Sequence, residues 1–117
     1  MTFAKLATAA LLAFMSGSAA RAADMSFRCE GVNQTTGAQL QPFTVDIRNK
    51  TVTLGGLDAL GKSFSLIQQD SHFLVFKNGA KTQGGNIDRT SMTINLYELD
   101  KARHKLAVSI GGRCAAQ

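Results

Sequence analysis

The sequence predicts a small all-β protein, an antiparallel meander of about seven to eight short strands with little helix, closed into a barrel or a two-layer sandwich. Apolar and polar residues alternate with a period of two along most of the chain after residue 24, the pattern of half-buried strands. Turn-forming residues separate these segments. Closure protects strand edges that would otherwise be exposed.

The N-terminal 22 residues have the features of an export signal. Lys5 gives a positive start, residues 6–15 form an uncharged apolar run, and Ala20-Arg21-Ala22 fits the small-x-small cleavage pattern. The apolar run is too short to span a bilayer, and no later segment is long enough. We therefore expect a cleaved signal at 1–22, one domain at 23–117, no transmembrane segment, and a periplasmic or secreted protein.

The first half of the domain contains three expected strands. Residues 26–30 form the first and include a cysteine, and residues 43–47 form the second through alternating Phe, Val and Ile. The tripeptide 48–50 predicts a turn into the third strand at 52–54. Residues 57–60, between two glycines, are the best helical candidate, as a single helical turn or simply a loop.

The second half contains four more expected strands. Residues 63–69 place Phe64 and Leu66 inward, with Ile67 as a further inward candidate. Residues 72–77 are nearly all apolar, which is typical of a strand covered on both faces or closed into a barrel. Asn78-Gly79 is the strongest turn signal of the chain. The last two strands, which alternate regularly, are expected at residues 92–97 and 106–110.

The only two cysteines, Cys29 and Cys114, lie in the first expected strand and near the C-terminus. In an oxidising compartment they predict an intramolecular disulfide that ties the first strand to the last. The alternatives are an intermolecular bridge or a pair of metal-binding thiolates. Such a closure is worth about 4–5 kcal/mol in the loop-entropy model.

The residue types exclude several function classes. After residue 22 the chain has 11 Lys and Arg against 8 Asp and Glu, a mild excess without interleaved aromatics, so nucleic acid is not an expected partner. Residues 56–63 match the G-x-x-x-x-G-K-[ST] phosphate-binding loop, but no long helix is expected after them. His72 and His104 are too isolated to predict a metal site. Nucleophile motifs are also lacking. We expect no cofactor, no catalytic residues and no enzyme.

A cluster of basic residues is the remaining candidate site. Lys101, Arg103, His104 and Lys105 lie in the expected loop of the last hairpin. A protruding basic loop can dock an acidic protein, a sugar phosphate or a lipid headgroup. The alternative is a solvated hairpin tip whose lysines discourage edge-to-edge aggregation.

Short motifs give a family resemblance. The signal, a cysteine near each end, Ile87-Asp88-Arg89-Thr90 before a strand and the closing Gly111-Gly112-Arg113-Cys114 resemble uncharacterised small exported proteins of Gram-negative bacteria. That resemblance implies a periplasmic location and no activity. In size and strand pattern the chain is also similar to the periplasmic inhibitors of C-type lysozyme, which are small disulfide-bearing barrels, although their inhibitory loop motif has no match here.

The expected function is therefore that of an exported, non-catalytic binding or interaction protein of the bacterial envelope, whose partner is an envelope component or an acidic protein. One alternative is a carrier that holds a small apolar ligand in the barrel mouth, among Phe64, Phe73, Phe76 and Leu96. Another is a protein that acts like a lysozyme inhibitor. The oligomeric state stays open.

Overall fold

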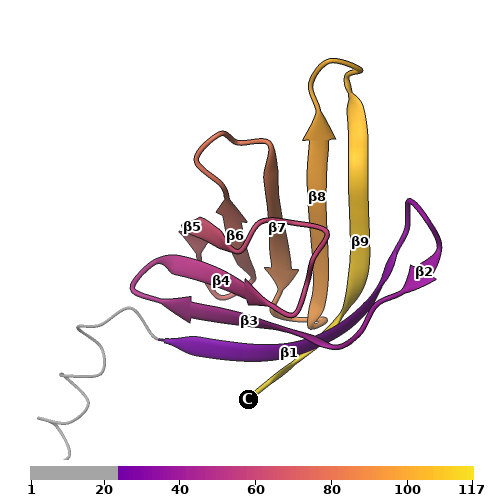
Figure 1. The fold of residues 1–117 in the computed structure, drawn as a ribbon. Coiled ribbons are helices and arrows are strands. Elements are labelled where there is room, and N and C mark those ends of the chain that lie inside the picture. Colours follow the sequence, from indigo (N-terminus) through magenta and orange to yellow (C-terminus); the bar gives the residue numbers. More distant parts are fainter. Residues whose placement is uncertain (1–23) are drawn as a thin grey trace, which may run out of the picture.

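The computed structural model describes residues 24–117, and every regular element in that range is a strand. The expected signal at 1–22 lies outside the described residues. Nine antiparallel strands form one sheet (Figure 1), which confirms the predicted all-β fold. The strands are β1 (Met25–Asn33), β2 (Ala38–Gln39), β3 (Phe43–Arg48), β4 (Thr51–Gly55), β5 (Ser63–Gln69), β6 (Phe73–Lys77), β7 (Gln83–Asp88), β8 (Thr93–Asp100) and β9 (Lys105–Ala116).

Strand β1 closes the sheet into a barrel because it pairs along both edges. Its first part pairs with β3, ending with Cys29 opposite Phe43, while its longer second part pairs with β9. The strands from β3 to β9 pair in chain order. Eight strands therefore form the closed barrel, and the two-residue β2 is an additional strand beside the end of β1.

The disulfide joins β1 to β9, the strand pair that closes the barrel, which we call the seam. Cys29 and Cys114 lie directly opposite each other in the β1–β9 pair and are bonded, which confirms the predicted bridge. Cys29 is fully buried and Cys114 nearly so. A disulfide is compatible with the oxidising compartment that the sequence predicts.

Glycines bring the two strands of the seam together next to the disulfide. Gly31 faces Gly112 in the β1–β9 register. A Cβ atom on Gly112 would overlap the carbonyl oxygen of Glu30, and one on Gly31 would lie 2.7 Å from that of Gly111. Only hydrogen fits at these two positions, so Gly31 and Gly112 have a structural role in barrel closure.

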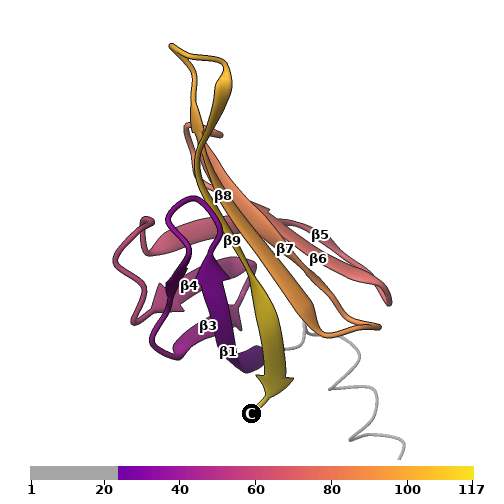
Figure 2. The ribbon, with the colours of Figure 1, turned by 90° about the vertical axis from the view of Figure 1, so that its right-hand side faces the viewer.

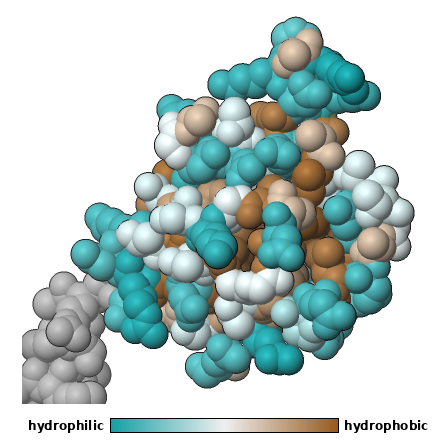
Figure 3. All heavy atoms as spheres, viewed as in Figure 1, coloured by the Kyte–Doolittle hydropathy of each residue, from teal (hydrophilic) through white to brown (hydrophobic). Residues whose placement is uncertain are grey.

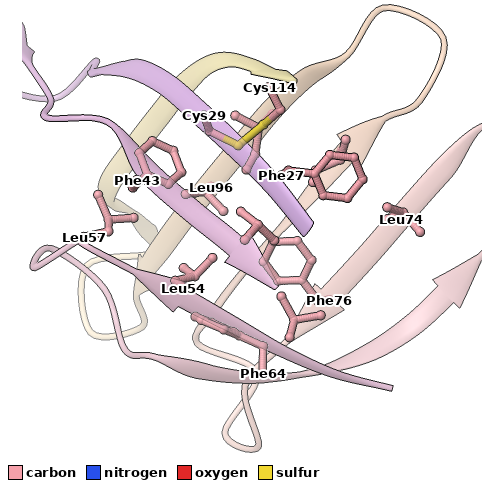
Figure 4. Close-up of a cluster of buried hydrophobic side chains, with 14 of the residues drawn as sticks. Phe27, Cys29, Phe43, Leu54, Leu57, Phe64, Leu74, Phe76, Leu96 and Cys114 are labelled. Atoms are coloured by element: carbon pink, nitrogen blue, oxygen red, sulfur yellow. A yellow bond between two sulfur atoms is a disulfide. The ribbon is translucent and has the colours of Figure 1, made fainter. Parts of the chain in front are cut away.

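Side chains fill the interior of the barrel. Inward residues alternate with outward ones along the strands, as the period of two predicts, and the inward set is almost completely excluded from solvent (Figure 4). Phe64 of β5 and Phe76 of β6 meet edge to face with ring centroids 5.5 Å apart. The largest side chains below 2% exposure are Phe43, Phe76, Ile47, Leu54, Leu74, Ile87, Ile94, Leu96 and Ile110.

The predicted turns at 48–50 and at Asn78-Gly79 lie where the sequence indicates them, although the second belongs to a longer connection between Lys77 and Gln83. Asn49 and Lys50 both have positive φ angles, 49° and 64°, as the two central residues of a tight hairpin turn require. The side-chain oxygen of Asn78 accepts hydrogen bonds from the backbone N–H groups of Thr82 and Gln83, so this asparagine organises the β6–β7 turn as its sequence context indicates.

Strand β7 is absent from the expected set of strands. Its sequence begins Gln83-Gly84-Gly85, and glycines contribute no apolar side chain to an alternation pattern. In the structure a Cβ on Gly85 would lie 2.5 Å from both the carbonyl oxygen of Asn95 and a methyl group of Leu96. Gly85 removes an apolar side chain from the sequence pattern of this strand. The fold nevertheless needs a glycine there, because neighbouring groups pack directly against it.

Two apolar residues of β5 and β6 face away from the interior. Phe73, expected inward, is 41% exposed, while Leu74 and Phe76 on the same strand are buried. The strand at 72–77 is thus closed into the barrel and is not covered on both faces. Ile67 is 57% exposed because a β-bulge between Leu66 and Gln68 interrupts the alternation of β5.

The loop between β4 and β5 covers one end of the barrel. Residues 57–60 form an irregular loop and not a helical turn. Leu57 and Leu60 of this loop are buried, at 5% and 6% exposure, and belong to the core. The apolar residues that raised the possibility of a helix therefore close the barrel end instead.

Candidate functional site

The β8–β9 hairpin extends beyond the barrel wall. The last pair between β7 and β8 is Gln83 with Glu98, and the pairing of β1 with β9 begins at Ile110. Beyond these points the two strands continue their ladder only with each other, through Leu99 with Leu106 and Asp100 with Lys105. Figures 1 and 2 show this hairpin as a projection that stands clear of the other strands.

The structure places the four predicted basic residues on this projection. Lys101, Arg103 and His104 form the turn, Lys105 begins β9, and all four are exposed. Arg103 Nε lies 3.8 Å from the Asp100 carboxylate, an exposed ion pair of the kind that contributes little to stability. The basic side chains are thus presented to solvent together, as the sequence predicts.

Two exposed leucines accompany the basic residues, and the sequence does not reveal them. Leu99 and Leu106 lie directly opposite each other and are 39% and 50% exposed. Leu106 fits the alternation of an inward-facing residue, but a bulge beside Glu98 and the end of the barrel wall leave it in solvent. A hollow of about 310 Å³ opens beside Leu99, and its other lining residues are Asp100, Lys101, His104 and Lys105.

Hydrogen bonds connect the projection to two neighbouring loops. Gly61 N–H donates to the side-chain oxygen of Gln83 (2.9 Å), whose amide donates in turn to Glu98 (2.7 Å). Leu99 N–H donates to the carbonyl oxygen of Thr82 (2.7 Å). The β4–β5, β6–β7 and β8–β9 loops therefore lie at one end of the barrel. We call residues 56–62, 77–82 and 98–106 the hairpin end.

The net positive charge of the described chain is concentrated at the hairpin end. Residues 24–117 contain 11 Lys and Arg and 8 Asp and Glu. Six of these basic residues and three of the acidic ones belong to the hairpin end, while the remaining five and five cancel. Figure 3 shows the tip as a mainly hydrophilic projection. The six basic residues are Lys62, Lys77, Lys81, Lys101, Arg103 and Lys105.

The phosphate-loop match and the two histidines lack the structural surroundings that nucleotide or metal binding requires. The phosphate-loop match at 56–63 runs into strand β5, where the nucleotide-binding fold has a helix. His72 lies in the β5–β6 turn and His104 in the β8–β9 turn. In the antiparallel strand order these two turns lie at opposite ends of the barrel. Within residues 24–117, no three His, Cys, Asp or Glu side chains gather closely enough to hold a metal ion. The same range contains no helix suited to crossing a membrane.

The four residues expected around a ligand in the barrel mouth do not share a cavity wall. Phe64, Phe76 and Leu96 pack in the buried core, whereas Phe73 lies on the outer surface. A pocket of about 380 Å³ opens instead near the two ends of the described chain, away from the hairpin end. It is lined by Asp24, Met25, Ser26, Phe27, Arg89, Met92, Ala116 and Gln117.

Asp70 organises the β5–β6 turn through its carboxylate. It accepts hydrogen bonds from the backbone N–H of Phe73, from the side-chain amide of Gln68 and from the backbone N–H of His72, at 2.7–2.8 Å. Because these donors favour the charged form, in this order of importance, they lower the pKa of Asp70 from 3.8 to about 2.

Asp70→Asn is expected to destabilise the protein at neutral pH but not at pH 2. A carboxyl group with a lowered pKa in the folded state stabilises that state above its unfolded pKa, near 3.8. This contribution disappears as the pH falls towards 2. Urea unfolding of both proteins from pH 7 to pH 2 measures the difference, which should shrink below pH 4. A constant difference would contradict the assignment, and carboxyl NMR titration reads the pKa directly.

Comparisons with known proteins leave the function to be argued from geometry. No protein-family model, curated protein or solved structure matches the chain. The resemblance to small exported proteins of Gram-negative bacteria stays a prediction.

Proposed function

We propose that this protein is an exported, non-catalytic binding module of the bacterial envelope that docks onto an anionic component through its hairpin end. The observation that carries the proposal is the concentration of the whole net positive charge at this end, around a hairpin that stands clear of the barrel. Exposed charges of one sign attract partners of the opposite sign and accelerate association.

The packing of the barrel interior gives less support to the alternative function of a small-ligand carrier. A carrier needs interior space, whereas Phe64, Phe76 and Leu96 are already packed in the core and Leu57 and Leu60 cover one end of it. A small barrel normally fills its interior with its own side chains. Docking through an exposed projection requires no interior space and uses residues that the fold already presents.

Replacing Lys101, Arg103 and Lys105 together with glutamine is expected to reduce retention of the protein on envelope fractions. The reason is that docking depends on their charge. The free energy of unfolding should change by less than about 1 kcal/mol, because solvated surface charges contribute little to stability. Co-sedimentation with envelope fractions at low salt measures retention. Wild-type retention should fall in the same way at about 1 M salt, where the screening length drops to about 3 Å.

A matched control removes three charges elsewhere. Arg28, Arg48 and Arg113 are exposed and lie outside the hairpin end, so replacing them with glutamine gives the same net charge as the hairpin variant. The control should retain most of the wild-type binding. Equal losses in both variants would mean that net charge alone governs retention, and unchanged retention in both would leave the hairpin as a solvated tip.

A further inference from the structure

We infer that the partner of the hairpin end is a bilayer surface with anionic phospholipid headgroups, which Leu99 and Leu106 enter while the basic residues remain at the phosphates. This inference names the partner class of the proposed docking and rests on that function.

The leucine pair forms one exposed apolar spot near the tip. Because Leu99 and Leu106 are directly opposite in the ladder, their Cβ atoms lie about 4.5–5.5 Å apart and their side chains share one face of the hairpin. About two-fifths and half of their respective surfaces contact solvent. Burial of such side chains at the boundary between headgroups and acyl chains is favourable.

Basic residues lie next to the leucines, in the turn and at the start of β9. Lys101 follows Leu99 by two positions, Lys105 directly precedes Leu106, and Arg103 lies at the turn between them. Long basic side chains keep their charge at the interface while their methylene groups lie along apolar surface. Lys62 and Lys81, on the two adjoining loops, add positive charge behind the projection. The combination matches an anionic membrane surface, which attracts each nearby basic residue.

The size of the projection favours a membrane over a folded protein. Of the hairpin end, only residues 99–106 project beyond the barrel wall. A folded protein that meets this tip contacts far fewer than the roughly 20–30 residues that a stable protein interface employs on each side. Reversible membrane association needs only a small apolar anchor together with a basic cluster. A narrow tip with two leucines and three permanent positive charges supplies both.

Vesicle co-sedimentation tests the inference. The protein is mixed with vesicles of phosphatidylcholine alone or of phosphatidylcholine with phosphatidylglycerol, at about 0.1 M and 1 M salt. We expect binding to the anionic vesicles at low salt only. Since each basic residue at an anionic surface strengthens binding by about fivefold, the Lys101, Arg103 and Lys105 triple glutamine variant should bind about a hundredfold more weakly.

The leucines have their own variant and control. Leu99→Gln with Leu106→Gln should weaken binding to anionic vesicles by about tenfold or more, because the apolar contribution is lost. Ile67→Gln removes the most exposed large apolar side chain outside the hairpin end and should leave binding unchanged. All variants share the same N-terminal segment, so differences between them report only on the substituted residues.

The outcomes separate this inference from the proposed function. Loss of envelope retention in the triple variant, without binding of the wild type to anionic vesicles, would overturn the lipid inference and indicate an acidic protein or polymer partner. Equal vesicle binding by wild type and both hairpin variants would also overturn it. If the triple variant keeps its envelope retention, the proposed docking function itself is wrong, whatever the vesicles show.

Discussion

Replacing Cys29 and Cys114 together with alanine is expected to lower the free energy of unfolding by about 4 kcal/mol. The bridge joins residues 85 positions apart, so it restricts nearly the whole unfolded chain between Asp24 and Gln117, and loop-closure entropy assigns about 4–5 kcal/mol to a loop of this length. For a domain of this size the melting temperature should fall by roughly 20 °C. Urea and thermal unfolding of both proteins measure the effect.

The reductant dependence provides the control for this result. Wild type treated with a reductant should match the double variant, whereas the double variant should not respond to reductant. Cys29 is fully buried, and alanine keeps an apolar side chain there, so the main loss is the crosslink. A melting temperature within about 3 °C of that of the oxidised wild type would show that the β1–β9 pairing keeps the barrel closed without the disulfide.

Much of the fold can be predicted from the sequence, because half-buried strands and the cysteine pair leave recognisable signals. An antiparallel strand with one buried face must alternate apolar and polar residues, so segments such as Phe43–Arg48 reveal both their strand conformation and their inward side chains. The two cysteines then indicate which strands meet at closure. The fold class, most of the strands and the disulfide follow from these local and pairwise signals.

The errors arise where backbone geometry overrides alternation. Gly84 and Gly85 carry no side-chain signal, so the sequence does not reveal β7, although neighbouring strands pack tightly onto it. Ile67 lies at a bulge, and a bulge leaves no mark in composition. Phe73 follows an exposed turn and lies on the outer face at the start of its strand. Because residues 73–76 are all apolar, the sequence does not show which of them face inward.

The candidate site, too, can be predicted from the sequence only in part. The basic residues of the last hairpin are visible in the sequence, because charged residues between two strands predict an exposed turn. The exposed leucines are not, because their exposure depends on where β8 and β9 leave the barrel wall. The concentration of charge is equally hidden, since it requires Lys62 and Lys81 to come from distant segments to the same end of the fold.

Phe76→Ala is expected to lower the free energy of unfolding by about 3–5 kcal/mol, the range for truncating a buried phenylalanine. Phe76 is fully excluded from solvent and packs edge to face on Phe64, with ring centroids 5.5 Å apart. Alanine would leave a cavity in the centre of the barrel. Phe76→Leu, which keeps most of the volume, should cost less and provides a measurable variant if the alanine protein does not fold.

Phe73 is the matched control because it is the same residue type on the same strand. It points outward and is 41% exposed, so Phe73→Ala should change the free energy of unfolding by less than about 1 kcal/mol. Urea unfolding of the disulfide-intact proteins compares the two substitutions. Similar small effects would mean that Phe76 faces an open cavity, which would revive the carrier function. A large difference would place Phe76 in a filled core, so that binding is left to the outer surface and the hairpin end.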